Sequence, residues 1–167
     1  MTDGKYRLLS PKGHDDVKNI LRQEAFGYLA VQGNTPYVVP INFAYAESDD
    51  PDSWGQIFFH SGPGRKAAAL AADPRICLAV ATGAGLHKGE QPCNDSFNYR
   101  SILVEGKATL LDDLQKKQQV LCAIVAKYDP EAIRQPFSQP FNEQALAKTL
   151  VYSVGIEVVS FKQKHRA

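Results

Sequence analysis

The clearest structural signal in the chain is the stretch PYVVPINFAYA, residues 36–46. Large side chains occupy every second position from Tyr37 to Tyr45, and the positions between them are mostly small or polar. A period of two is typical of a β-strand with one buried face. Pro40 lacks a backbone donor and belongs at a sheet edge or a bulge, which exposes neighbouring backbone groups. The small face would let a flat ligand lie close to the backbone, although packing against a helix produces the same pattern.

Outward from this stretch, five further strands are predicted at residues 27–32, 54–60, 75–82, 98–111 and 150–161. Helices are predicted from Asp15 to just before Gly27, and at residues 65–72, 113–128 and 143–148. Most connections between strands are too short for parallel crossovers, which favours an antiparallel barrel. Gly106 is expected at a bulge or a close approach. We expect residues 1–167 to form a single domain.

Two segments are expected to lack regular structure. Residues 83–97 are predicted to form a long loop, and long loops in compact chains are often functional. Residues 129–142 contain Gln-Pro-Phe twice and are interpreted as an extended segment interrupted by prolines.

Composition excludes several classes of protein. The 19 basic and 18 acidic residues leave a formal net charge of +1, which argues against a nucleic-acid partner. No apolar run is long and uninterrupted enough to span a membrane, and the first residues lack a signal-peptide layout. The three cysteines are widely spaced, which excludes a disulfide framework and a CxxC metal or redox pair. We therefore expect a cytoplasmic protein with no membrane partner and no metal site.

The stretch IFFHSGPGRKAA, residues 57–68, carries the strongest functional signal. A strand ends, glycines turn the chain, and Arg65 and Lys66 start a helix, where cations oppose the helix dipole. A bound anion would reverse this cost, because backbone N–H groups, the dipole and both cations would converge on it. His60 and Ser61 add hydrogen-bonding capacity. The alternative is an exposed basic turn, and the spacing is not that of a Walker phosphate loop.

An ordered set of segments resembles the pyridoxamine 5′-phosphate oxidase-like family of FMN-binding split barrels, and within it the nitroimidazole-resistance, nitroreductase-like branch. The matching segments cover nearly the whole chain: GYLA (27–30), PYVVPINF (36–43), FFHS (58–61) with Arg65 and Lys66, Leu70 with DPRIC (73–77), and YRSILVEGKA (99–108). The ordered set is more specific than any one segment. The resemblance implies a mostly β fold, a six-stranded antiparallel split β-barrel with peripheral helices.

The resemblance also implies a homodimer with FMN in two clefts between the subunits. Arg65 and Lys66 match the phosphate-binding pair of the family. The remaining matched positions line the phosphate and ribityl chain, face the isoalloxazine ring, or approach the flavin from the other subunit. Phe59, His60 and Gly64 match the first group, Val39, Pro40, Ile41 and Asn42 the second, and Tyr99, Arg100 and Ser101 the third. Ser61, in the matching FFHS segment, is a further candidate for cofactor binding.

The resemblance predicts a flavin-dependent oxidoreductase that reduces a small, flat, electron-poor substrate. The electron donor stays open, and because the chain has no GxGxxG fingerprint, any NAD(P)H would bind transiently at the flavin face. His60 is the candidate catalytic residue, orienting a substrate beside the flavin; the alternative is a half-buried histidine with one backbone hydrogen bond. The sequence after Val158 lacks the Arg-x-His element of the authentic oxidase, so pyridoxamine phosphate is not the expected substrate. Two alternatives stay open: a non-enzymatic flavin-binding or storage module, and a split barrel that uses haem or a deazaflavin.

Overall fold

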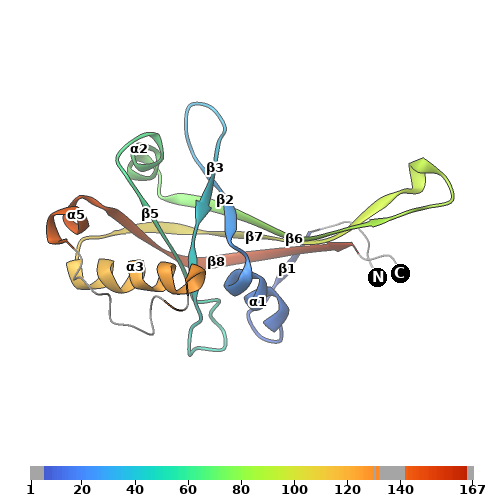
Figure 1. Ribbon diagram of the computed structural model, residues 1–167, viewed down its shortest axis with the longest axis horizontal. Coiled ribbons are helices and arrows are strands. Elements are labelled where there is room, and N and C mark those ends of the chain that lie inside the picture. The colour runs from blue at the N-terminus through green and yellow to red at the C-terminus, as the bar shows by residue number, and fades with distance from the viewer. Residues whose placement is uncertain (1–5, 130, 132–141, 165–167) are drawn as a thin grey trace.

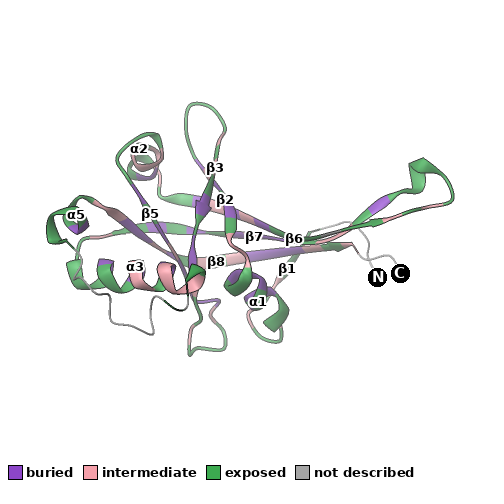
Figure 2. Ribbon diagram, viewed as in Figure 1, coloured by how far each residue is buried: buried purple, intermediate pink, exposed green. Residues whose placement is uncertain are grey.

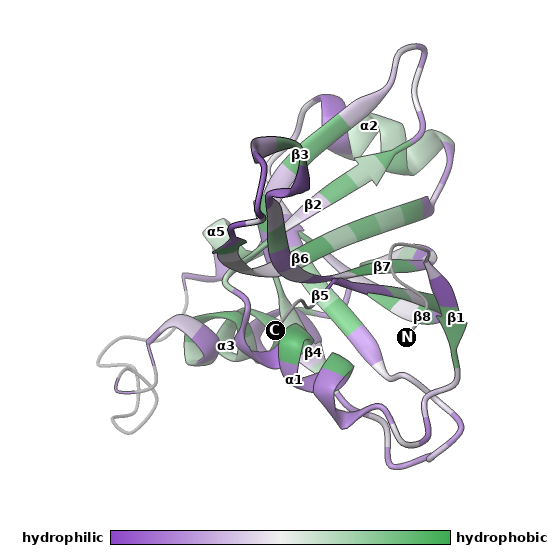
Figure 3. Ribbon diagram, turned by 90° about the vertical axis from the view of Figure 1, so that its right-hand side faces the viewer, coloured by the Kyte–Doolittle hydropathy of each residue, from purple (hydrophilic) through white to green (hydrophobic). Residues whose placement is uncertain are grey.

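The computed structural model describes residues 6–129, 131 and 142–164, and one antiparallel sheet dominates this part of the chain (Figure 1). The strand order is β3-β2-β6-β7-β8-β5-β4, and β1 pairs with β8 beside this path. The sheet curls on itself, so the predicted split β-barrel with peripheral helices is confirmed (Figure 3). The strands are β1 (Arg7–Leu9), β2 (Phe26–Val31), β3 (Tyr37–Asn42), β4 (Ala44–Ala46), β5 (Gln56–Ser61), β6 (Arg75–His87), β7 (Ser96–Leu111) and β8 (Leu150–Lys164).

The inner face of the curled sheet holds the main hydrophobic core (Figure 2). The alternation that predicted the strand at residues 36–46 decides which side chains reach this core. Ile41 and Phe43 are buried in it, whereas Val38, Pro40 and Asn42 are exposed on the other face. Burial of the apolar face is the main driving force that curls the sheet.

Four α-helices surround the described part of the barrel: α1 (Asp15–Gln23), α2 (Arg65–Ala72), α3 (Leu114–Tyr128) and α5 (Glu143–Lys148). Leu21 of α1 and Leu70 of α2 join the main core. The outer helix α3 buries Val120 and Ile124 in a second cluster with β4 and β8. Asp113 caps the start of α3, since its carboxylate accepts a hydrogen bond of 2.7 Å from the Lys116 N–H.

The prediction of six strands was wrong, because the described residues form eight. The three-residue β1 is too short to give a periodic signal. Residues 36–46 form two strands, since the Phe43 N–H donates to the Tyr128 hydroxyl (3.1 Å) instead of to a neighbouring strand. The same hydroxyl donates to the Ala25 carbonyl (2.5 Å), at the end of the connection from α1 to β2. Helix α1 accordingly ends at Gln23, earlier than predicted, and Phe26 already begins β2.

The predicted loop at residues 83–97 was also wrong. β6 continues to His87 and β7 begins at Ser96, and together they form a two-stranded extension, the β6–β7 arm (residues 83–98), which projects from the body (Figure 1). Its tip contains a short 3-10 helix, η1 (Pro92–Asn94). The pairing shifts register between Thr82 and Gly85. The alternation of side chains is interrupted there, so the sequence pattern did not predict that the strand continues. Most of the Gln-Pro-Phe segment, residues 132–141, lies outside the described residues.

Gly106 satisfies both parts of its prediction. The pairing of β7 with β8 shifts register between Glu105 and Gly106, which is a bulge or similar irregularity. A Cβ atom at Gly106 would lie 2.2 Å from the Gly155 carbonyl oxygen. The two strands can therefore approach this closely only with glycine at position 106.

Candidate cofactor site

The barrel is split where the two ends of the sheet order fail to pair with each other, and β3 is the terminal strand at one of these ends. β3 pairs with β2 alone among the described strands, so one edge of its backbone faces the split. Pro40 lies in this edge strand, where a missing N–H costs no ladder hydrogen bond. The predicted segment Val39, Pro40, Ile41 and Asn42 thus lies on an edge strand, one side of whose backbone has no partner strand within the described residues.

The loop between β5 and α2 closes one end of the split. Phe59 points into the core, the Ser61 hydroxyl donates to the Gly62 carbonyl (2.7 Å), and Gly64 precedes the first turn of α2. Gly64 has φ +145° and ψ −163°, a conformation that is essentially restricted to glycine. A Cβ atom added at Gly64 would have no atom within 4 Å, so the backbone conformation and not crowding requires the glycine.

Arg65 links this loop to the beginning of β3. Its guanidinium carbon lies 4.1 Å from the centre of the Tyr37 ring, and its Nη2 donates a hydrogen bond of 2.8 Å to the Thr35 hydroxyl. A planar guanidinium stacks on an aromatic face while other N–H donors stay available for a ligand. Arg65 is therefore oriented by two contacts from the opposite side of the split.

Lys66 lies over the aromatic end of β5. Its Nζ donates to the His60 carbonyl (3.3 Å) and lies 5.6 Å from the centre of the Phe59 ring. Burial lowers the pKa of Lys66, and burial together with the Lys66 charge lowers the pKa of His60. His60 is therefore mainly neutral at pH 7. None of the ion pairs found among residues 6–129, 131 and 142–164 involves Arg65 or Lys66.

These residues have the chemistry of a site for a phosphate group. Two cations without carboxylate partners in the described structure stand at the first turn of α2, which has no acidic residue and no side-chain cap. The backbone N–H groups of such a turn are available to an anion. Gly64 leaves the approach open because no side chain projects there. The observed donor set therefore fits the phosphate of a nucleotide-type cofactor.

The remaining predicted residues, Tyr99, Arg100 and Ser101, lie elsewhere in the chain. Ser61 pairs with Leu150 at the start of β8, whereas Tyr99 pairs with Lys164 at its end. These ends are about 45 Å apart along the strand at the usual rise per residue. Within one chain, the structure therefore does not bring Tyr99–Ser101 to the phosphate-type site.

The segment around Tyr99 has its own local contacts. The Ser101 hydroxyl hydrogen-bonds to the Tyr6 hydroxyl (3.1 Å), and the Lys162 Nζ lies 5.8 Å from the centre of the Tyr99 ring. A small hollow of about 160 Å³ is lined by Tyr99, Arg100 and five neighbours. This segment thus presents cationic and aromatic groups at the root of the β6–β7 arm.

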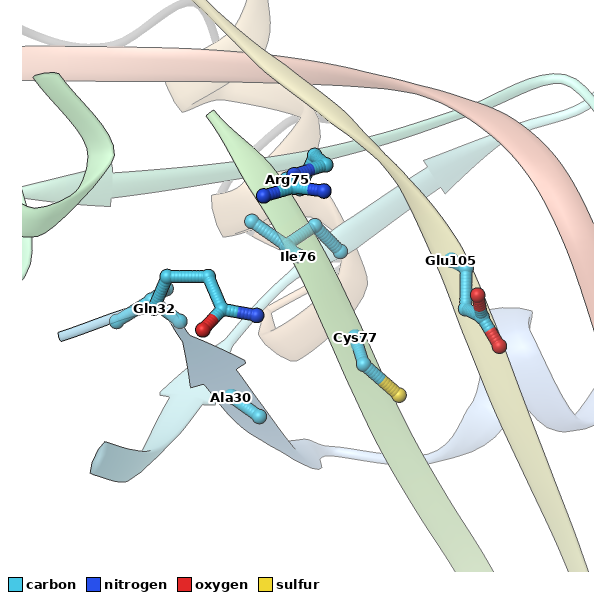
Figure 4. Close-up of a pocket in the computed structure, with 7 residues that line it drawn as sticks. Ala30, Gln32, Arg75, Ile76, Cys77 and Glu105 are labelled. Atoms are coloured by element: carbon cyan, nitrogen blue, oxygen red, sulfur yellow. The ribbon is translucent and has the colours of Figure 1, made fainter. Parts of the chain in front are cut away.

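A separate hollow of about 300 Å³ opens on the outer sheet face, beside Ala30, Gln32, Arg75, Ile76, Cys77 and Glu105 (Figure 4). Cys77 and Glu105 pair across β6 and β7, and burial together with the Glu105 charge raises the pKa of the Cys77 thiol. Its thiol is therefore poorly reactive at neutral pH. Arg75 is held by Asp73, with 2.6 Å between Nη2 and Oδ2.

Sequence reasoning missed Thr35 and treated Tyr37 only as a core residue. Thr35 sits in a turn between two strands, where a threonine carries no distinguishing signal. Tyr37 belongs to the large face of its strand, but only the three-dimensional structure shows that this face meets Arg65.

No described group of three or more His, Cys, Asp or Glu side chains could hold a metal ion. The described helices include none that is long and apolar enough to cross a membrane.

A family model described as pyridoxamine 5′-phosphate oxidase matches residues 13–163. The chain belongs to this family. The resemblance seen in the sequence is thereby confirmed over nearly the whole chain. Comparison with curated protein sequences gives no match.

Three similar solved structures illustrate what this member of the family resembles. A candidate 5-nitroimidazole antibiotic resistance protein from Bacteroides thetaiotaomicron is 22% identical, with 95% of this chain and 88% of that chain covered and a TM-score of 0.72. The flavocytochrome Anf3 from Azotobacter vinelandii is 26% identical (96% and 70% covered, TM-score 0.77). An FAD and haem binding protein from Mycobacterium smegmatis is 19% identical (98% and 75% covered, TM-score 0.78). These similarities show a shared fold.

Proposed function

We propose that this protein is a flavin-dependent oxidoreductase that holds FMN by its phosphate at Arg65 and Lys66. The observation that carries the proposal is the convergence of these two cations, without described carboxylate partners, at an uncapped helix start beside the open edge of β3. Phosphate oxygens are the ligands that such a donor set binds best. Two of the similar structures are named as a flavocytochrome and as an FAD-binding protein, which supports a flavin in this fold.

Each part of the site has a distinct task in this proposal. Arg65 and Lys66 bind the phosphate, Gly64 leaves room beside it, and the Ser61 hydroxyl donates to the Gly62 carbonyl within the turn. The unpaired backbone edge of Val39–Asn42 orients the flavin ring. Bound flavin would supply the hydride and electron transfer, so the protein itself needs to bind, orient and exclude water rather than to provide an acid–base pair. In this proposal His60, which lies at the end of β5 and has a lowered pKa, is the neutral side chain that exchanges a hydrogen bond with the substrate.

We further propose that the protein acts as a homodimer with its flavin sites between subunits. Tyr99, Arg100 and Ser101 lie at the opposite end of β8 from Arg65, and they can contribute to a flavin site only in a second copy. The name of the Bacteroides protein supports a small, flat, electron-poor substrate such as a nitroaromatic compound or a quinone. NADH or NADPH is the proposed electron donor.

A second candidate function is a flavoprotein that also carries haem. Two similar structures favour it, because one is named a flavocytochrome and the other an FAD and haem binding protein. The alternative keeps the fold and the phosphate-type site but adds a second redox group.

A visible absorption spectrum of the purified protein followed by anaerobic reduction tests the proposal. Two flavin bands that bleach on addition of NADH or NADPH, and return when a nitroaromatic or quinone substrate is added, are the expected result. A Soret band beside the flavin bands would support the second candidate. Flavin bands that dithionite bleaches but neither NADH nor NADPH does would refute the proposed nicotinamide-dependent oxidoreductase and leave a flavin-binding module.

A further inference from the structure

The two terminal strands of the sheet, β3 and β4, are consecutive in the chain and are joined by a single residue. β3 pairs with β2 up to Asn42, and β4 pairs with β5 from Ala44 onward, so Phe43 belongs to neither ladder. The barrel is therefore split from this residue outward, with β3 on one side and β4 on the other. The direction of the chain at Phe43 sets how far apart the two sides of the split lie.

The backbone of Phe43 has its hydrogen-bond partner outside the sheet. Phe43 is fully buried in the main core, and a buried backbone N–H without a partner is strongly disfavoured. The Tyr128 hydroxyl, at the end of α3, accepts a hydrogen bond of 3.1 Å from this N–H and lies 3.3 Å from the Phe43 carbonyl oxygen. A side chain 85 residues further along the chain thus takes the place of a neighbouring strand.

The same hydroxyl ties Phe43 to the residue that precedes β2. It donates a hydrogen bond of 2.5 Å to the Ala25 carbonyl. A hydroxyl has one proton and two lone pairs, so it can donate to Ala25 and accept from Phe43 at the same time. The Asn42 side-chain amide donates a longer hydrogen bond (3.5 Å) to the same carbonyl. One oxygen atom of α3 therefore connects the end of β3 with the start of β2.

The neighbouring residue of α3, Lys127, holds the ring of Phe43. Its Nζ lies 3.6 Å from the centre of that ring and donates a hydrogen bond of 3.0 Å to the Leu21 carbonyl in α1. Helix α3 is itself anchored by Val120 and Ile124 in the second apolar cluster. The end of a packed helix thus holds both the ring and the backbone of the residue at which the barrel splits.

We propose that Tyr128 is a positioning residue for the flavin ring. Its hydroxyl fixes Phe43 and, through it, the backbone of Ile41 and Asn42 at the open edge of β3. Hydrogen bonds from such backbone groups to the rim of a flavin depend on their position and tune its reduction potential. This inference rests on the proposed function, which assigns the ring to that part of β3.

The two ends of β3 are held by different side chains. Tyr37, its first residue, is stacked on Arg65 at 4.1 Å, whereas Phe43, just after its last residue, is held by Tyr128. These ends are about 20 Å apart at the usual rise per residue of a strand. Loss of the Tyr128 hydroxyl is therefore expected to disturb contacts to the ring and to leave the preference for the phosphate unchanged.

Flavin titration of Tyr128→Phe tests this role. The dissociation constants of FMN and of riboflavin are each expected to rise by about three- to tenfold, with an unchanged ratio, because one or two ordinary hydrogen bonds hold the edge. The visible spectrum and the midpoint potential of the bound flavin are also expected to shift.

Tyr45→Phe is the matched control for these measurements. It also removes a hydroxyl that donates to a backbone carbonyl, that of Trp54 at 2.6 Å, but it lies on β4, which is paired with β5. It should bind both flavins like the wild type, with an unchanged spectrum and potential. Wild-type affinities, spectrum and potential in Tyr128→Phe, or the same changes in both tyrosine variants, would overturn the proposal.

Amide hydrogen exchange of the flavin-free protein tests the contact without any ligand. In Tyr128→Phe the Phe43 amide is expected to exchange at least about tenfold faster than in the wild type, while amides of the β7–β8 ladder keep their rates. An unchanged Phe43 rate would refute the positioning role and leave the proposed function standing. A wild type that binds neither FMN nor riboflavin would instead refute the proposed function, and with it the flavin as the positioned ligand.

Discussion

The guanidinium carbon of Arg65 lies 4.1 Å from the centre of the Tyr37 ring, so the first residue of α2 is stacked on the first residue of β3. This contact spans the split of the barrel. It orients a cation beside β3, a terminal strand of the sheet that pairs only with β2 among the described strands. The stacking therefore holds Arg65 of the residue 64–66 turn against the beginning of β3, the strand to which the proposal assigns the flavin ring.

Replacement of Tyr37 tests whether this stacking positions Arg65. Tyr37→Leu removes the ring, and the FMN dissociation constant is expected to rise by about two- to fivefold, as for other exposed cation–π contacts. Tyr37→Phe keeps the ring and should bind FMN like the wild type. Flavin fluorescence titration measures both. Equal affinities for the Leu and Phe variants would show that the ring does not act through Arg65.

Gly64→Ala tests the backbone conformation at the helix start. With φ at +145°, an alanine there is expected to cost about 1–3 kcal/mol of unfolding free energy and to weaken FMN binding, because the turn must rearrange. Gly62→Ala is the matched control, since Gly62 has open space around its Cβ position and does not have a positive φ. Urea unfolding compares the two. Unfolding of both variants at the same denaturant concentration would show that position 64 does not require glycine.

Gly106→Ala tests the close approach of β7 and β8. Its Cβ atom would lie 2.2 Å from the Gly155 carbonyl oxygen, so a loss of about 1–3 kcal/mol of unfolding free energy is expected. Gly155→Ala, where nothing lies within 4 Å of the added Cβ, should cost less. Thermal and urea unfolding of the pair measure the difference. A larger loss for the Gly155 variant would contradict the described strand register.

The sequence predicted most of the architecture because the relevant signals are local. Alternation along residues 36–46 separated buried Ile41 from exposed Pro40, and the charge and glycine pattern located Arg65 beside a tight turn. The break at Phe43 was not predictable, because it depends on a hydrogen bond from a residue far along the chain, Tyr128. The β6–β7 arm was missed because glycines and a register shift interrupt its alternation.

The candidate site was predictable in part for the same reason. The cations follow a recognisable strand–turn–helix pattern, whereas their orientation depends on Thr35 and Tyr37, which reach Arg65 from across the split. The distance between the Arg65 loop and Tyr99 depends on the pairing of both with β8, and no local pattern encodes it.

Lys127 predicts a specific pH dependence of stability. Its Nζ donates to the Leu21 carbonyl (3.0 Å) and lies 3.6 Å from the centre of the Phe43 ring. Burial lowers its pKa from 10.5 to about 8, against a smaller opposing effect of Glu24. Between these values the unfolded chain binds more protons than the folded one, so the contribution of Lys127 to the free energy of unfolding rises with pH.

The measurement compares wild type with Lys127→Met by urea unfolding at several pH values. The difference in unfolding free energy, wild type minus variant, is expected to be flat below about pH 7 and to increase from about pH 8 to about pH 10. Groups that titrate in both proteins cancel in this difference. A difference that stays constant over the whole range would mean that Lys127 is not desolvated in the folded state.

The central claim is that Arg65 and Lys66 hold the phosphate of a flavin, and comparison of FMN with riboflavin tests it most directly. The two ligands differ only by the phosphate. With two charge-assisted contacts to it, the wild type is expected to prefer FMN by at least about a hundredfold. Arg65→Ala/Lys66→Ala should lose most of that preference and fold normally, and Arg75→Ala, whose side chain pairs with Asp73, should keep it. A wild type that binds both ligands equally, or a double variant that still prefers FMN, would contradict the claim.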